Sequence, residues 1–163
     1  MQIAEKKRTE QTELLQLVSF ILNDEEFGID ILLVQEIIRI MQITKVPNSP
    51  DFIDGVINIR GRVIPVINLR NRLGMPRKEN DKDTRIIVVE ISGKTVGFVV
   101  DAVNEVLRIP ASITEPPQEL VVGINSEFIK SVGKLEDRLL ILIDLAEILS
   151  SSEKIQLQEV SDE

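Results

Sequence analysis

An internal duplication constrains the fold of this chain more than any other feature. Residues 17–40 align without a gap on residues 86–109 at a shift of 69 positions, and a second block follows at a shift of 76 positions. The clearest matches are Gly28 with Gly97, Val34 with Val103, Glu36 with Glu105, Phe52 with Phe128 and Arg62 with Arg138. A repeat of this length indicates two copies of one structural unit.

The composition indicates that this unit is mainly β. The chain has 24 Ile and 17 Val against four Ala, and β-branched side chains suit a pleated, half-buried surface. Each copy has the pattern strand, turn, strand, a short helical turn near residues 34–36 in the first copy, strand, loop, and a hairpin closed by a few helical residues. We expect two five-stranded barrels that share one apolar core, because a barrel this small buries limited apolar area alone.

The repeat also sets the expected boundaries. The folded region is expected at residues 14–150, with subdomains at about 14–73 and 84–149. Polar segments at 1–13 and 151–163 are expected to be flexible ends. The chain contains no recognisable signal peptide and no apolar run long enough for a transmembrane span.

Missing residue types exclude several functions. Without Cys or His, the chain cannot form disulfides, Cys/His zinc sites, cysteine nucleophiles or Ser-His-Asp triads. The net charge of −8 and an aromatic content of 3% argue against binding to nucleic acid or an anionic membrane surface. We expect neither a cofactor nor a metal.

Carboxylates leave one enzymatic alternative, a small hydrolase or lyase that uses Asp51, Asp54 or Asp101. Structural roles are favoured for all three, because Asp51 and Asp101 suit caps and Asp54-Gly55 suits a tight turn. A ligand-binding double barrel without a signalling role is a further alternative.

A hairpin turn distinguishes the two copies. Arg60-Gly61 aligns with Glu136-Asp137, so the same turn carries a cation in one copy and two anions in the other. Glu36 is a candidate partner for Arg60, because the two residues belong to strands that should be neighbours in the first barrel.

Several motifs occur in the order and spacing of a known family. They are Phe27-Gly28-Ile29-Asp30-Ile31, Val34-Gln35-Glu36-Ile37, Val46-Pro47-Asn48, Phe52-Ile53-x-Gly55-Val56-x-Asn58-x-Arg60-Gly61-x-x-x-Pro65-Val66, Val96-Gly97-Phe98-Val99-Val100-Asp101 and Asp137-Arg138-Leu139-Leu140-Ile141-Leu142. Over about residues 14–149 the chain resembles the CheW family of bacterial chemotaxis coupling proteins. The resemblance implies two SH3-like five-stranded β-barrels with short helices.

The resemblance also implies a function. Such proteins are non-enzymatic cytoplasmic adaptors, recruited to membrane receptor arrays. They bind the cytoplasmic tips of methyl-accepting chemoreceptors and the regulatory domain of the histidine kinase CheA. The chain has no room for a kinase or receiver domain, which favours a free adaptor.

Transferred by motif, the two expected surfaces use different residues. The receptor surface, in an apolar groove between the barrels, would contain Val34, Glu36, Ile37, Arg60, Gly61, Val99, Asp101 and Val103. The kinase surface, at the barrel ends, would contain Ile38, Ile40, Ile43, Val106 and Ile109.

Overall fold

The computed structural model describes residues 13–49, 52–116 and 128–148. The described elements are β1 (Leu14–Leu22), β2 (Glu25–Asp30), η1 (Ile31–Leu33), β3 (Val34–Arg39), β4 (Ile53–Ile59), β5 (Arg62–Asn68), α2 (Leu69–Arg72), β6 (Arg85–Ile91), β7 (Lys94–Val100), β8 (Ala102–Pro110), η2 (Ala111–Ile113), β9 (Thr114–Glu115), β10 (Ile129–Lys134), β11 (Leu139–Ile143) and α3 (Leu145–Ile148). The mainly β prediction with short helices is confirmed.

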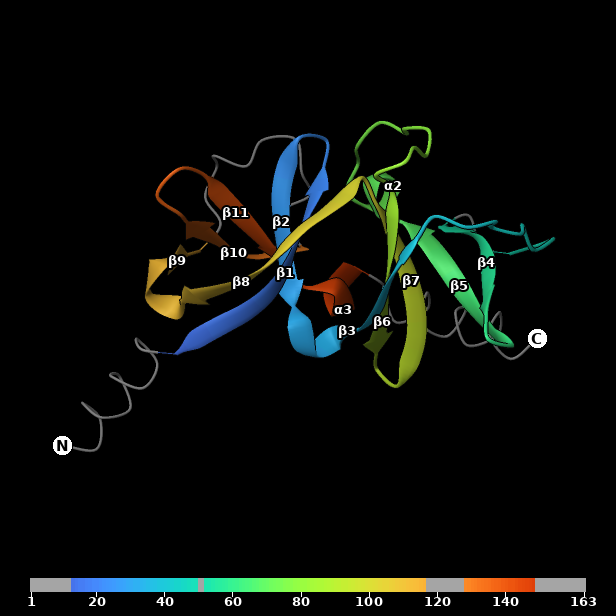
Figure 1. Cartoon of the computed structure of the whole chain (residues 1–163), viewed down its shortest axis with the longest axis horizontal. Helices are drawn as coiled ribbons and strands as arrows, with labels where there is room; N and C mark the ends of the chain where they lie inside the picture. Colours follow the sequence, from blue (N-terminus) through green and yellow to red (C-terminus); the bar gives the residue numbers. More distant parts are fainter. Residues whose placement is uncertain (1–12, 50–51, 117–127, 149–163) are drawn as a thin grey trace.

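The strands form two sheets that lie side by side (Figure 1). Sheet A has the order β8-β1-β2-β11-β10-β9, and sheet B has the order β3-β6-β7-β5-β4. Each sheet therefore combines strands from both copies of the repeat. The predicted division into contiguous subdomains at 14–73 and 84–149 is wrong for the strands.

Short connections explain this exchange. Only Asp101 separates β7 from β8, and only η1 separates β2 from β3. These links are too short to carry the chain back around its own sheet, so it crosses into the other one. The sheets are then completed by parallel pairing of β2 with β11 and of β5 with β7, in each case between copies.

Both sheets curl toward closed barrels. After β3, the backbone of Thr44 makes two hydrogen bonds with Val56 of β4, at 2.9 and 2.8 Å, which join the two edges of sheet B. In sheet A, β8 continues through η2 into β9, which pairs with β10 at the opposite edge. This closure agrees with two SH3-like barrels and leaves little unpaired strand edge.

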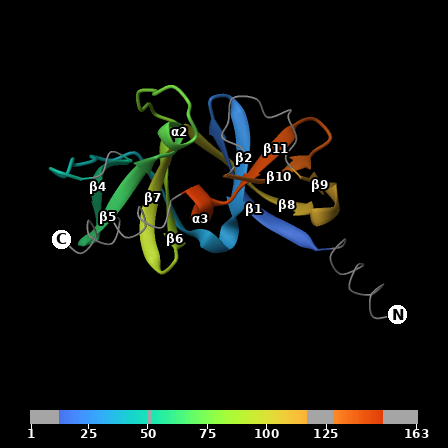
Figure 2. The same cartoon turned by 180° about the vertical axis from the view of Figure 1, so that it is seen from behind.

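The predicted shared core is present. One large buried cluster takes side chains from both sheets and from α2 and α3, and α3 lies between the sheets in both views (Figures 1 and 2). Two smaller clusters fill the interiors of sheet B and sheet A. The buried apolar residues of the described part of the chain thus form three clusters.

The repeated glycines let neighbouring strands approach closely. Gly28 faces β11 across the parallel seam of sheet A, and Gly97 faces its antiparallel neighbour β6 in sheet B. A Cβ on Gly97 would lie 2.8 Å from Cγ2 of Ile86, and a Cβ on Gly28 would lie 3.0 Å from Cδ2 of Leu142. Gly97 and Gly28 both occupy paired positions where strands of different copies meet. The structural role expected for these glycines is therefore close approach of strands.

The helical turn lies three residues before its predicted place. The 3-10 turn η1 spans Ile31–Leu33, and Val34 already begins β3. The carboxylate of Asp30 accepts a hydrogen bond of 2.9 Å from the Leu32 N–H, which caps the turn. The sequence interpretation missed this cap.

Candidate partner-binding surface

The pair expected between the Arg60 turn and β3 is confirmed. The Arg60 guanidinium donates two hydrogen bonds to the Glu36 carboxylate, at 2.8 and 3.3 Å. Arg60 and Gly61 form the β4–β5 turn with φ of 51° and 83°, and the Gly61 N–H donates to Asn58 Oδ1 at 2.9 Å. The turn therefore holds the arginine against β3.

This ion pair is a surface feature. The side chain of Arg60 is 75% exposed and that of Glu36 is 31% exposed. The hydrogen bonds from Arg60 hold the pKa of Glu36 below its ordinary value. Because water screens so exposed a pair, its main effect is to orient two charges beside the half-exposed Ile37.

Three other residues expected at the receptor surface do not join this patch. Val99 is only 7% exposed and belongs to the interior cluster of sheet B, and Val103 packs against the shared core. Asp101 lies in a buried ion pair. Val99 and Asp101 therefore do not form the expected open surface. Val99 lies in β7, which is apolar and covered on both faces, and Asp101 follows β7 and is covered by Arg70. Val34 is half-buried against the shared core.

Asp101 instead joins α2 to the β1–β2 turn. Arg70 donates to its carboxylate from Nε at 2.8 Å and from Nη2 at 2.6 Å, and the Asn23 N–H donates to it at 2.9 Å. Both charged side chains are nearly nine-tenths buried. Burial raises the pKa of Asp101, but the hydrogen bonds from Arg70 and Asn23 outweigh it and lower the pKa overall. The sequence interpretation missed Arg70, because nothing local links it to a carboxylate 31 residues away.

The residues expected at the kinase surface mostly face inward. Ile109 is 3% exposed in the interior of sheet A, where it cannot reach a partner. Ile38, Ile40 and Ile43 are partly buried against the interior of sheet B. Val106, by contrast, is 58% exposed. The alternation of β8 explains the split, since Leu107 and Ile109 share the inner face and Val106 the outer one.

An unpredicted polar cluster surrounds Glu26 in sheet A. Arg138 donates from Nε to Glu26 at 2.5 Å and from Nη2 to Glu105 at 2.9 Å, and the buried Ser19 hydroxyl donates to Glu26. Arg138 aligns with Arg62, which in sheet B donates to Thr95 at 3.1 Å. The two copies therefore support the matching residues Glu36 and Glu105 with arginines from different positions.

Glu26 should make folding stability sensitive to acid. Burial raises its pKa, but hydrogen bonds from Ser19, Arg138 and Asn104 lower it overall. A carboxyl group with a lowered folded-state pKa contributes stability that is complete above its unfolded-state pKa, about 4, and is lost as pH falls through the folded value. We expect Glu26→Gln to lose less stability between about pH 5 and about pH 3 than the original chain.

Urea unfolding at several pH values measures this effect. Glu105→Gln is the matched control, because it removes a half-exposed carboxylate from the same arginine. Equal pH dependence of Glu26→Gln and the original chain would contradict the assignment.

The carboxylates of the enzymatic alternative do not gather in the described part of the chain. Asp54 pairs with Arg77 at 3.5 Å and Asp101 pairs with Arg70, while Asp51 lies outside the described residues. Neither Asp54 nor Asp101 lines the cavity of about 680 Å³ in sheet A. Asp54 also lies within β4 rather than in a tight turn. Nothing here favours the hydrolase or lyase interpretation.

Two wider searches cover the described ranges. Residues 13–49, 52–116 and 128–148 contain no group of three or more carboxylates placed to hold a metal ion. Within the same part of the chain, no helix is long and apolar enough to cross a bilayer.

Comparison with known proteins gives a consistent family assignment. A model of the CheW-like domain matches residues 16–153. The chain is 40% identical over 146 residues to the chemotaxis protein CheW of Klebsiella aerogenes, across 90% of this chain and 88% of that protein. It is 37% identical over 134 residues to the chemotaxis protein CheW of Bacillus subtilis, across 82% of this chain and 86% of that one.

A solved structure agrees with this assignment. The crystal structure of the scaffolding protein TtCheW from Thermoanaerobacter tengcongensis matches with a TM-score of 0.78 and 39% identity. The match covers 86% of this chain and 96% of that one. Both the sequence and the fold therefore show that the chain belongs to the family of CheW-like domain proteins.

Proposed function

We propose that this chain is a non-enzymatic chemotaxis adaptor that couples transmembrane chemoreceptors to the histidine kinase CheA by binding both. The observation that carries the proposal is the CheW-like match over residues 16–153, with relatives named as chemotaxis proteins and a solved relative described as a scaffolding protein. The adaptor would act in the cytoplasm at membrane receptor arrays, and it needs no cofactor.

The proposed receptor surface is centred on β3 and the β4–β5 turn. Glu36 and Arg60 present a fixed pair of opposite charges, and Ile37 adds an exposed apolar side chain next to Glu36. A receptor tip is a helical hairpin, and a helix can lay apolar side chains on such a patch while the charges set its register. Gly61 lies in the turn with open space around it, and Val34 supports β3 from the shared core.

The proposed kinase surface lies elsewhere, at the outer face of β8 around Val106. Separate surfaces would let one molecule hold the receptor and the regulatory domain of CheA at the same time. Each contact then raises the effective concentration of the other partner, so weak contacts suffice to hold an array together. Ile38, Ile40 and Ile43 would support a barrel end rather than provide all of its contacts.

Reversing the charge of Arg60 should separate the two binding activities. We expect Arg60→Glu to weaken capture of a purified receptor signalling tip by about tenfold, because it sets two carboxylates against each other at the patch. Capture of the CheA regulatory domain should be unchanged. Pull-down titrations with each partner measure both effects, and urea unfolding checks that the fold is retained.

Arg77→Glu is the matched control, because Arg77 is equally exposed, at 78%, and also pairs with an aspartate. We expect it to leave receptor capture unchanged. Unchanged capture by Arg60→Glu would remove Arg60 from the receptor surface. Failure of the original chain to bind either partner would overturn the proposed function itself.

A further inference from the structure

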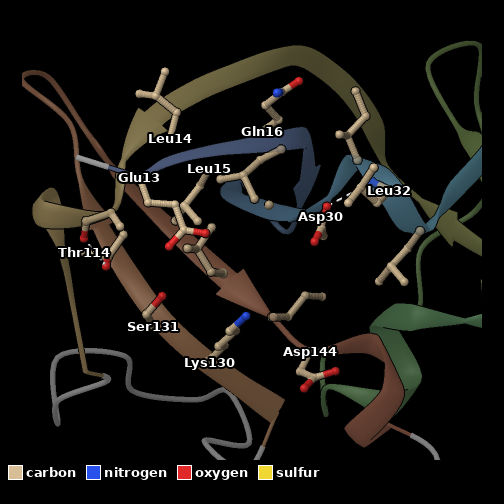
Figure 3. A pocket seen from close by; sticks show the side chains of 17 residues that line it. Glu13, Leu14, Leu15, Gln16, Asp30, Leu32, Thr114, Lys130, Ser131 and Asp144 are labelled. Atoms are coloured by element: carbon tan, nitrogen blue, oxygen red, sulfur yellow. Dashed lines mark hydrogen bonds between the residues drawn. The ribbon is translucent and has the colours of Figure 1, made fainter. Parts of the chain in front are cut away.

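Sheet A contains a cavity of mixed polar and apolar lining that the proposed adaptor surfaces do not use. The cavity has a volume of about 680 Å³ and lies between the start of β1, the turn η1 and the ends of β10 and β11 (Figure 3). Its lining combines aliphatic side chains, among them Leu15, Leu17, Leu142 and Ile143, with polar and charged ones. None of the residues proposed above for receptor or kinase binding lines it.

The cavity exists because the parallel seam of sheet A ends early. In sheet B, β5 and β7 pair at three positions, the last of which joins Asn68 to Val99. In sheet A, β2 and β11 pair at only two positions and stop at Gly28 and Leu142. The parallel pairing of β2 with β11 in sheet A therefore ends earlier than the equivalent pairing of β5 with β7 in sheet B.

The internal repeat supplies the physical reason. The residues of sheet A that align with Val99 and Asn68 are Asp30 and Asp144. In the register of sheet A, a third pair would join Ile29 to Ile143. A fourth would place the carboxylates of Asp30 and Asp144 directly opposite each other, which destabilises a sheet. Each aspartate instead accepts a backbone hydrogen bond, Asp30 from Leu32 and Asp144 from Ala146. Their charges therefore remain at the mouth of the cavity.

The mouth is also bordered by exposed leucines. Leu32 is 88% exposed and Leu14 is 57% exposed, and both belong to the cavity lining. The residue that aligns with Leu32 in the second copy is Asp101, which is tied to Arg70. A small molecule inside the cavity would leave Leu32 in water, whereas a polypeptide segment would cover both the cavity and its border.

The charges of the lining favour a basic occupant. Glu13, Asp30 and Asp144 contribute three carboxylates, against the single ammonium group of Lys130. Figure 3 shows Asp30 at the η1 side and Asp144 beside α3. A partner with basic side chains on either side of an apolar one would match this distribution.

We infer that this cavity is a docking site for an amphipathic segment of a partner protein, whose apolar side chains enter the cavity and whose basic side chains meet Asp30 and Asp144. This docking site is a third binding surface, separate from those proposed for the receptor and the kinase. The inference does not depend on the proposed function, because it rests on the cavity, its border and its charge.

A synthetic helical peptide with leucines on one face and lysines on the other provides the probe. Fluorescence anisotropy with the labelled peptide and the full chain measures binding. We expect Leu32→Ser to weaken binding by about tenfold, because the residue is apolar, exposed and central to the border. The double variant Asp30→Asn with Asp144→Asn should weaken it by a similar factor, while its amide oxygens still accept both backbone hydrogen bonds.

Matched controls separate docking from general attraction to an acidic protein. Leu139→Ser removes another exposed leucine, and Glu79→Gln with Glu136→Gln removes two exposed carboxylates away from the cavity. Both controls should bind the peptide as the original chain does. A peptide with glutamates in place of the lysines should bind at least about tenfold more weakly.

Four results would overturn the inference. They are absence of binding, equal weakening by the control variants, equal binding of the glutamate peptide, and self-association of the chain that Leu32→Ser abolishes. The last result, seen by sedimentation, would mean that the face belongs to a second copy of this chain.

Discussion

Replacing Gly55 with alanine is expected to destabilise the fold by about 3 kcal/mol, because no space exists for the added methyl group. A Cβ at this position would lie 2.5 Å from the backbone oxygen of Thr44 and 2.8 Å from Cγ2 of Ile43. Gly55 occupies a bulge in β4, where the register shifts between Ile53 and Gly55. The clash falls on the hydrogen-bonded bridge between Thr44 and Val56 that closes sheet B.

The free energy of unfolding from urea titration measures this cost. Gly61→Ala is the matched control, because Gly61 has a φ of +83° but nothing within 4 Å of a Cβ. It should lose only about 1 kcal/mol, the cost of a left-handed conformation for alanine. Similar losses for Gly55→Ala and Gly61→Ala would show that close approach does not decide the effect.

Replacing either Arg70 or Asp101 is expected to lower the free energy of unfolding by about 3 kcal/mol, because each substitution leaves the other buried charge without its partner. Arg70→Met leaves the Asp101 carboxylate with only the Asn23 N–H among the hydrogen bonds described above. Asp101→Asn keeps an acceptor for that N–H but removes the charge opposite Arg70. Both substitutions loosen the connection between α2 and the β1–β2 turn.

A double-mutant cycle in urea tests the coupling. We expect Arg70→Met with Asp101→Asn to lose at least about 1 kcal/mol less than the two single losses added together. Lys134→Met is the control, since Lys134 pairs with Glu115 at 3.0 Å with both side chains about half exposed. It should cost less than about 1 kcal/mol. Additive losses at Arg70 and Asp101 would contradict a coupled buried pair.

The surface pair of the candidate site was predictable because it depends on strands of one copy. Glu36 on β3 and Arg60 in the β4–β5 turn both belong to the first copy, and β3 and β4 are the two edges of sheet B. Closing the barrel brings these two edges together, with β6 and β7 of the second copy completing the sheet between them. The same reasoning explains why the shared core was predictable from the apolar pattern of the repeat.

Val99 and Ile109 were expected on binding surfaces but are buried, because an apolar residue in a strand can lie on either face of the sheet. A continuous apolar run such as residues 96–100 is typical of a strand buried on both sides, and this signal was available for Val99. For Ile109 and Val106, the alternation of β8 separates the two faces, but it does not say which face lies inside. Only the tertiary packing settles that question, because it places Ile109 in a buried cluster with Leu140 and Leu142.

By itself, the amino-acid sequence indicated two copies of a β unit and a shared apolar core, and it made Glu36 a candidate partner for Arg60. Repetition, side-chain chemistry and apolar spacing are properties of short segments, so they can be recognised without knowing which strand pairs with which. Tertiary structure alone decided that the copies exchange strands, that Asp101 pairs with Arg70, and that the seam beside Asp30 stays open. Each of these depends on which distant segment lies opposite, and identical local patterns permit pairing within a copy as well as between copies.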